Sequence, residues 1–195
     1  HPEWNMTHRA VLHNIDLSNG TITLQGNTYP LIDTHLPTLN PNDPYALNQD
    51  EQDLMNQLHR SFRKSEKMQR HLRLLYEHGS LYLVHNGFLL YHAAIPLNQD
   101  GSFTEIDVCG ECVKGKALMD RIDQVIRMAY YGEGKEKEDA LDYMLYLWQG
   151  EHSPLYNKDR MTTFERYFIA DKQTHEEKKG AYFNLSDDEC TCNNI

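Results

Sequence analysis

Two histidines close the two halves of one apolar stretch, residues 79–96. His85 ends the first half, His92 ends the second, and an Asn-Gly pair separates them. Asn-Gly is the strongest short-range hairpin signal, because a type I′ turn requires positive φ at both central residues. Strands this apolar are typical of burial on both faces, so we expect the second to present the His92 imidazole at its end. The small Ala93 and Ala94 would leave room for a ligand there, whereas the alternative is a core strand ending in a hydrogen-bonded histidine.

Four cysteines form two close pairs, Cys109 with Cys112 and Cys190 with Cys192. Together they could supply a four-thiolate zinc site. Against this, the second pair is separated by one residue and lies near the end of the chain. Redox chemistry has less support, because the first pair does not open a helix after a strand. We therefore favour incidental thiols.

The sequence motifs of several other catalytic classes are absent. There is no Gly-x-Ser-x-Gly elbow, Walker loop, Gly-x-Gly-x-x-Gly fingerprint or helical His-Glu-x-x-His. His85 and His92 could be neighbours on paired strands. Two imidazoles would still not fill the ligand shell of a catalytic metal, which needs at least three protein ligands.

A second unusual stretch, residues 153–169, mixes cations with threonines and aromatic rings. Its basic residues are Lys158, Arg160 and Arg166. Polar groups of several kinds beside bulky rings suit a loop next to a binding site. The alternative is an ordinary loop followed by a buried strand.

The composition narrows the class of protein. The chain has 195 residues, a formal net charge of -10 and 4 cysteines. That charge disfavours nucleic acid and anionic membranes as partners, and no apolar run is long enough to span a bilayer. Few cysteines and no signal-peptide pattern favour a cytoplasmic protein. The chain starts at His1 without an initiator methionine and ends without a closing element, so we expect a fragment of something longer.

The elements that position these residues alternate between helices and short strands, which predicts an α+β fold. We expect one domain or domain fragment over residues 1–195. Residues 1–48 would hold a short helix, a hairpin and an extended connector, and residues 49–195 helices, the central hairpin and the basic, aromatic block. The expected helices cover residues 6–14, 50–77 with a break near Ser65, 116–131, 140–148 and 171–179, and the expected strands lie near 15–24, 28–32, 81–92 and 103–108.

Many segments of the chain resemble the class III fructose-1,6-bisphosphatases of Firmicutes and some other bacteria. The longest match is at residues 161–169, where the chain reads MTTFERYFI. Together the matches cover essentially the whole chain: PEWNMxHR at 2–9, NGT at 19–21, TYPL at 28–31, SEK at 65–67, GSLY at 79–82, NG at 86–87, LLYH at 89–92, IP at 95–96, DGSF at 100–103, YLW at 146–148 and DKxTH at 171–175.

The resemblance implies that the protein is a calcineurin-like metallophosphatase. This chain would then form part of a two-sheet sandwich flanked by helices. In the full enzyme, the resemblance also implies two divalent metal ions, manganese or magnesium. By resemblance His92 is a metal ligand, although Ala93 and Ala94 stand where the family tends to have glycine and a small residue. The family's other ligand motifs, Asp-x-His, Gly-Asp-x-x-Asp-Arg-Gly, Gly-Asn-His and Gly-His-x-His, are absent. The chain therefore resembles the middle of the enzyme, and we expect it to be inactive alone and to bind no metal.

In the full enzyme, the resemblance implies hydrolysis of fructose 1,6-bisphosphate to fructose 6-phosphate and phosphate, a step of gluconeogenesis. Lys158, Arg160 and Arg166 are candidates for holding the distal phosphate, because guanidinium groups bind phosphate through two hydrogen bonds. Each could equally pair with a surface carboxylate. The alternative function is a non-catalytic regulatory or interaction domain derived from that family, and a cysteine-held zinc module is a weaker third. Homo-oligomerisation is left open.

Overall fold

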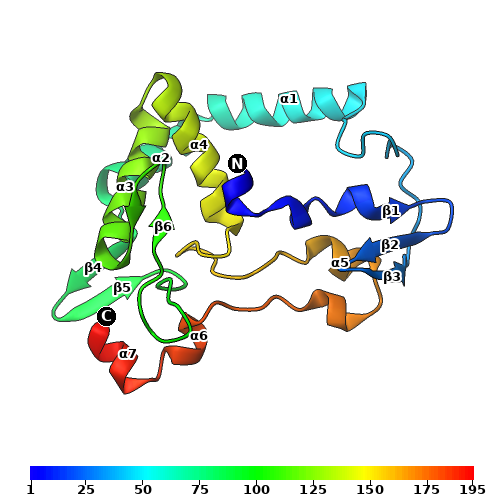
Figure 1. Cartoon of the computed structure of the whole chain (residues 1–195). Helices are drawn as coiled ribbons and strands as arrows, with labels where there is room; N and C mark the ends of the chain where they lie inside the picture. Colours follow the sequence, from blue (N-terminus) through cyan, green and yellow to red (C-terminus); the bar gives the residue numbers. More distant parts are fainter. The chain divides into compact units, whose positions relative to one another are not determined.

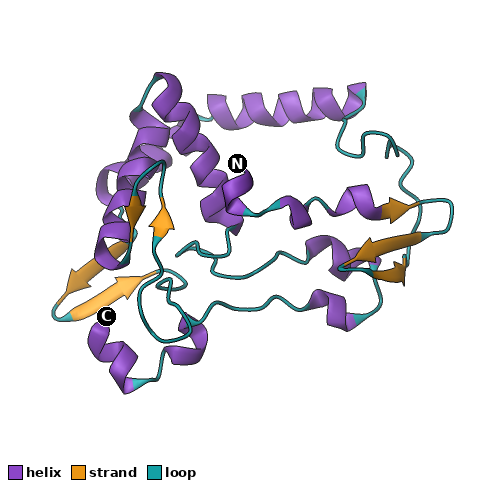
Figure 2. Cartoon of the chain, viewed as in Figure 1, coloured by secondary structure: helices purple, strands orange, loops and turns teal.

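The computed structural model describes residues 1–195, apart from the side chain of Pro2. Its contacts divide the chain into two compact units, residues 1–74 with 162–176 and residues 75–161 with 177–195. Helices and small antiparallel sheets make up both units, so the predicted α+β class is confirmed (Figure 2). The boundary between the units falls after Leu74, inside a helix.

The first unit is organised on a three-stranded antiparallel sheet in the order β1-β2-β3. Its strands are β1 (Ile15–Asp16), β2 (Thr21–Leu24) and β3 (Asn27–Pro30). Ile22 is fully buried and pairs with Ile15 on one side and Tyr29 on the other. The predicted hairpin and the short strand after it are both confirmed.

The helix predicted over residues 6–14 is wrong. Three 3-10 turns stand at the N-terminus: η1 (Pro2–Trp4), η2 (Thr7–Arg9) and η3 (Val11–Asn14). The amide of Ala10 donates to the carbonyl of Thr7, which is the i to i+3 bond of a 3-10 turn. Ala10 then adopts a non-helical ψ of 62°, which separates η2 from η3.

Asp16 organises the turn between β1 and β2. Its carboxylate accepts from the amides of Ser18 and Asn19 and from both of their side chains. These hydrogen bonds, the one from the Ser18 side chain first, lower the pKa of Asp16 from 3.8 to about 2.

We expect Asp16 to titrate near pH 2 in a carboxyl NMR titration. Because its folded pKa is depressed, its stabilising contribution is fully present above its ordinary pKa of 3.8 and is lost as the pH falls toward about 2. Ser18→Ala should move the titration of Asp16 upward. A midpoint in the native protein at its ordinary value would contradict this account of the turn.

Two helices follow the proline-rich connector. Helix α1 (Gln49–Lys64) begins with a capping box in which Asn48 accepts from the Glu51 amide and Glu51 accepts from the Asn48 amide. Ser65 separates α1 from α2 (Glu66–His78), as the sequence predicted.

Helix α5 (Thr163–Phe168) and η4 (Lys172–His175) complete the first unit. The amide of Ile32 donates to the carbonyl of Phe168, and Leu31 forms a bridge with Ile169. These bonds hold the end of α5 beside the blue sheet in Figure 1. The polar helix predicted over residues 171–179 is limited to the single turn of η4.

The second unit has its core between two long helices, α3 (Gly115–Tyr131) and α4 (Gly134–Gln149). The buried side chains of this core are Leu118, Met119, Ile122, Val125 and Ala129 from α3 and Ala140, Tyr143, Tyr146 and Leu147 from α4. Helix α4 starts six residues before the predicted start at 140, and Trp148 on it is exposed rather than buried.

Two hairpins and two short helices surround this core: β4 (Tyr82–His85) with β5 (Phe88–Tyr91), β6 (Ile106–Asp107) with β7 (Cys112–Val113), α6 (Tyr182–Leu185) and α7 (Glu189–Asn194). No helix among the described residues has the length and apolar character needed to cross a membrane.

The central hairpin corrects one expectation. Its turn is formed as predicted, with positive φ at both Asn86 and Gly87. Its strands, however, are not buried on both faces, since Leu83 is 55% and Phe88 is 70% exposed. The sheets in this chain have three, two and two strands, so the two-sheet sandwich remains an expectation for a longer protein.

Candidate functional site

His92 follows directly after β5 and is exposed. Tyr91, the last residue of β5, pairs with Tyr82, the first residue of β4. His85 pairs with Phe88 beside the turn, so the two histidines lie at opposite ends of the hairpin. At about 3.3 Å per residue they are roughly 13 Å apart along the strands, too far to share a ligand.

The chain turns sharply after His92. Ala93 has a φ of 46°, in the left-handed region that L-residues rarely adopt. Ala94 is fully buried, and its amide donates to the carbonyl of Pro154 at 3.2 Å. The small residue at 94 is therefore packed against protein, and it leaves no room for a ligand on that side. This corrects the expectation that both alanines mark open space.

We expect Ala93→Gly to stabilise the protein by about 0.5 kcal/mol. Relief of the left-handed alanine should exceed the extra freedom that glycine gives the unfolded chain. Chemical denaturation measures the difference, and the neighbouring Ala94→Gly is the matched control. Ala94 is buried and has no positive φ, so its replacement should destabilise by about 1 kcal/mol. If both variants changed the free energy of unfolding in the same direction, the result would contradict the strained turn.

A tyrosine pair, which sequence reasoning did not identify, lies beside this turn. The hydroxyls of Tyr91 and Tyr182 form a hydrogen bond, and both rings pack against a small core of Ile95, Leu97 and Ala181. Burial, and then the bond to Tyr182, raises the pKa of the Tyr91 phenol well above its ordinary value. Tyr91 is therefore a neutral hydroxyl and not a base. Tyr182 is 91 positions away along the chain, so nothing in the local pattern indicates the pair.

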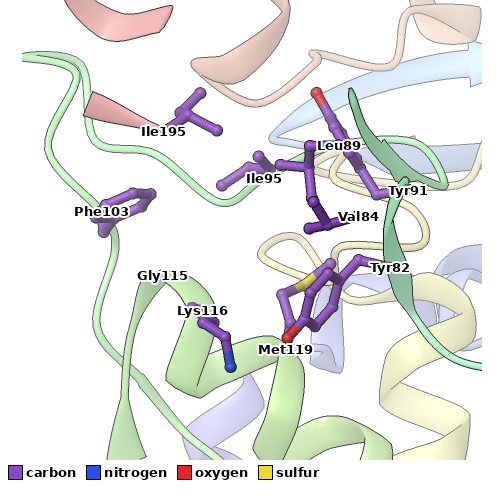
Figure 3. Close-up of a pocket in the computed structure, with 10 residues that line it drawn as sticks. All are labelled: Tyr82, Val84, Leu89, Tyr91, Ile95, Phe103, Gly115, Lys116, Met119 and Ile195. Atoms are coloured by element: carbon purple, nitrogen blue, oxygen red, sulfur yellow. The ribbon is translucent and has the colours of Figure 1, made fainter. Parts of the chain in front are cut away.

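A cavity of about 220 Å³ opens between the hairpin and α3 (Figure 3). Its walls are mostly apolar and include Val84 and Leu89 from the hairpin and Met119 from α3. The one ammonium group at its edge, Lys116, donates to Asp120 at 2.6 Å. Tyr82 donates to the same carboxylate at 2.7 Å.

The charges at this cavity compensate one another. The bond from Lys116, followed by that from Tyr82, lowers the pKa of the Asp120 carboxyl, which therefore remains ionised beside the ammonium. A doubly phosphorylated sugar needs several uncompensated cations, and this cavity does not offer them. The cavity thus does not correspond to the expected substrate site.

Two of the three proposed phosphate ligands are paired with carboxylates in the second unit. Lys158 Nζ lies 2.7 Å from Glu177 Oε2. Arg160 donates through Nε at 3.0 Å and Nη2 at 2.9 Å to Asp159 Oδ2, while Asp159 Oδ1 accepts from the Lys178 amide. This is the carboxylate pairing that the sequence left open as the alternative.

Arg166 belongs to the first unit and has a different role. Its Nε donates to Thr162 Oγ1 at 3.0 Å and its Nη2 donates to the His175 carbonyl at 3.0 Å. The Thr162 hydroxyl donates to the same carbonyl at 3.1 Å. The guanidinium therefore holds two parts of the first unit together.

The ring of His175 completes this arrangement. Its Nε2 lies 3.1 Å from the carbonyl of Glu165 and 2.9 Å from that of Ile169. Because both partners are acceptors, Nε2 must carry the proton and donate to both. The Glu165 carbonyl also accepts from the Ile169 amide, so His175 is its second donor, and His175 supplies a donor to the carbonyl of Ile169, the residue directly after α5. We call Thr162, Arg166 and His175 the α5 clamp.

The four cysteines are exposed and free. The Cys109 thiol lies near the Asp139 carbonyl, and burial raises the pKa of this thiol despite the opposing effect of Arg121. It is therefore a poor thiolate. Cys192 instead faces the Ser186 carbonyl at 3.2 Å. Nothing in these contacts supports the zinc module.

Within the described part of the chain, no three His, Cys, Asp or Glu side chains gather into a group that could hold a metal ion. A catalytic metal needs at least three protein ligands, and His92 would supply one. The residues of this chain do not by themselves fit a metal centre.

Comparisons with known proteins agree over the full length of the chain. The model of the Firmicute fructose-1,6-bisphosphatase family matches residues 1–195. Proteins named class 3 fructose-1,6-bisphosphatase from Bacteroides fragilis and Clostridium beijerinckii are each 49% identical over 196 residues, and one from Parabacteroides distasonis is 48% identical. Each alignment covers 100% of this chain but only 29–30% of the relative. No solved structure matches. With a family match over its whole length, the chain belongs to the Firmicute fructose-1,6-bisphosphatase family.

Proposed function

We propose that this chain contributes part of a class 3 fructose-1,6-bisphosphatase, which hydrolyses fructose 1,6-bisphosphate to fructose 6-phosphate and phosphate in gluconeogenesis. The observation that carries the proposal is the family match over residues 1–195. The chain spans about 30% of the length of the curated relatives it matches, so the activity belongs to a longer protein. We propose that this protein is cytoplasmic.

Divalent manganese or magnesium is part of the proposal for the longer protein only. His92 is the residue that would contribute a ligand from this chain, since it is exposed at the end of β5. The remaining ligands would come from outside residues 1–195, because no group of three donors exists among the described residues. We therefore propose that this chain alone is inactive and binds no catalytic metal.

We propose that Lys158 and Arg160 bind phosphate, and this proposal rests only on their position and their present partners. Both lie in the second unit, and each now faces one carboxylate, Glu177 or Asp159. A bound phosphate could replace these partners, because it also accepts charge-assisted hydrogen bonds. Arg166 remains a weaker candidate, since its donors are used in the α5 clamp.

A chimera tests the proposal directly. The 196-residue segment of the Bacteroides fragilis relative would be replaced by this chain. Phosphate release from fructose 1,6-bisphosphate is then measured with manganese. We expect activity within about tenfold of the parent and none from the isolated chain, with circular dichroism confirming that each protein is folded. A folded but inactive chimera would count against the function.

His92 is tested in the same chimera. His92→Ala should lower phosphate release at least about 100-fold, since loss even of groups that only support metal ligands costs 10–100-fold. His85→Ala is the matched control, because it removes the exposed histidine at the other end of the same hairpin. Equal activity of both variants would remove His92 from the proposed metal site.

The alternative function, a non-catalytic regulatory or interaction domain, has one observation in its favour. The apolar strands of the central hairpin are exposed in this chain, and exposed apolar surface of this kind marks interaction sites. An inactive chimera, together with binding of the isolated chain to the phosphatase relative, would favour this alternative.

A further inference from the structure

Helix α1 presents an apolar face that no part of its unit covers. Leu54, Met55, Leu58 and Phe62 are between 43% and 56% exposed, and none of the residues in α1 is buried. Their spacing of one, four and eight residues places them on one side of the helix. An isolated helix of 16 residues has only marginal stability in water, so we expect this face to pack against a partner.

The charges of α1 are divided between its two halves. Residues 49–56 contain the acids Asp50, Glu51 and Asp53 and no base, whereas residues 57–64 contain the bases Arg60, Arg63 and Lys64 and no acid. This division complements the helix dipole. It also makes the helix complementary to a second copy of itself that runs in the opposite direction.

We propose that α1 pairs antiparallel with α1 of a second copy of this chain, about a two-fold axis near Gln57. Asp50, Gln57 and Lys64 are seven residues apart and therefore lie along one edge of the apolar face. The two-fold axis places Asp50 opposite Lys64 of the second copy, and the reverse pair forms at the other end. A parallel pair would instead place like charges side by side.

The apolar contacts follow the same symmetry. Leu54 of each copy lies across from Leu58 of the other, and Met55 and Phe62 widen the seam on the opposite edge. An interface of this kind is self-complementary, as a two-fold dimer requires. The seam covers only about two heptads, fewer than a stable coiled coil, so the dimer is weak and depends on concentration.

Sedimentation equilibrium on the 195-residue chain tests the pairing. We expect the average mass to rise from monomer toward dimer with concentration, and less so at high salt. Asp50→Lys and Lys64→Asp should each weaken dimerisation about tenfold, because each introduces two repulsive pairs. The double variant should restore it. Lys172→Asp, the same charge change at an exposed residue outside α1, should have no effect.

Cross-linking tests the direction of the pair. In a background with the four cysteines replaced by serine, Gln57→Cys should form a disulfide-linked dimer on oxidation, since the two-fold axis brings position 57 close to itself. Asn56→Cys, which points away from the seam, should not. Any one of three results would overturn the proposal: a monomer at every concentration, equal cross-linking of both variants, or no rescue by the double charge reversal. This includes the case in which another part of a longer chain covers α1.

Discussion

Replacing Gly180 with alanine is expected to lower the free energy of unfolding by about 3 kcal/mol, at the upper end of the cost of overpacking a core. A Cβ at this position would lie 1.8 Å from Asn157 Oδ1 and 2.6 Å from its Cγ. Asn157 is only 2% exposed and has a positive φ of 52°, so its side chain has little room to move away. The Gly180 amide also donates to the Asn157 carbonyl at 2.9 Å, which fixes the two backbones together.

A double variant isolates the clash. Asn157→Gly removes the side chain that the new Cβ would meet and tolerates the positive φ, so Gly180→Ala should cost under about 1 kcal/mol in that background. Gly26→Ala is the control, because its Cβ would meet nothing within 4 Å and only its φ of 81° is unfavourable. Urea denaturation supplies all of these values. Equal costs at positions 26 and 180 would contradict the close approach.

Local signals in the sequence were sufficient for the turns and caps. Both Asn-Gly pairs produced hairpins, and Gly20 and Gly87 have the positive φ that such turns need. The start of α1 and its break at Ser65 also followed from residues within one helical turn. These features depend on neighbours in the chain, so a single sequence contains the information that determines them.

Burial could not be predicted in the same way. The apolar strands of the central hairpin indicated burial on both faces, yet Val84 and Leu90 are exposed in this chain. What covers a strand depends on segments that its own sequence does not describe. The helix expected over residues 140–148 was too short at its start, because lysine and glutamate are good helix formers and α4 begins at Gly134.

The candidate site shows the same limit. The position of His92 at the end of a strand could be predicted from the Asn-Gly turn and the apolar runs that flank it. The α5 clamp and the pair of Tyr91 with Tyr182 could not, because their partners lie on separate elements. The stretch at residues 153–169 suited a loop next to a binding site, with an ordinary loop and a buried strand as the alternative, and the structure gives Thr162 and Arg166 structural contacts.

The second large effect is expected at the α5 clamp. His175→Ala should lower the free energy of unfolding by about 3 kcal/mol, because it leaves the carbonyls of Glu165 and Ile169 without the imidazole donor. The Glu165 carbonyl still accepts from the Ile169 amide, whereas the carbonyl of the almost fully buried Ile169 loses its donor. A buried carbonyl left unsatisfied costs about 1–3 kcal/mol, and the lost packing of the ring adds to this.

His175→Gln separates the lost hydrogen bonds from the lost packing. The glutamine amide reaches about as far as Nε2 of histidine and keeps a donor for these carbonyls, so it should recover at least half of the loss. Arg166→Ala removes one of the two donors to the His175 carbonyl but leaves the Thr162 hydroxyl and the imidazole in place, and we expect a smaller cost of about 1 kcal/mol. In the active chimera, a structural Arg166 predicts lower thermal stability with an unchanged KM for fructose 1,6-bisphosphate. A raised KM at unchanged stability would instead return Arg166 to the phosphate site, so this pair of measurements decides between the two roles of the residue.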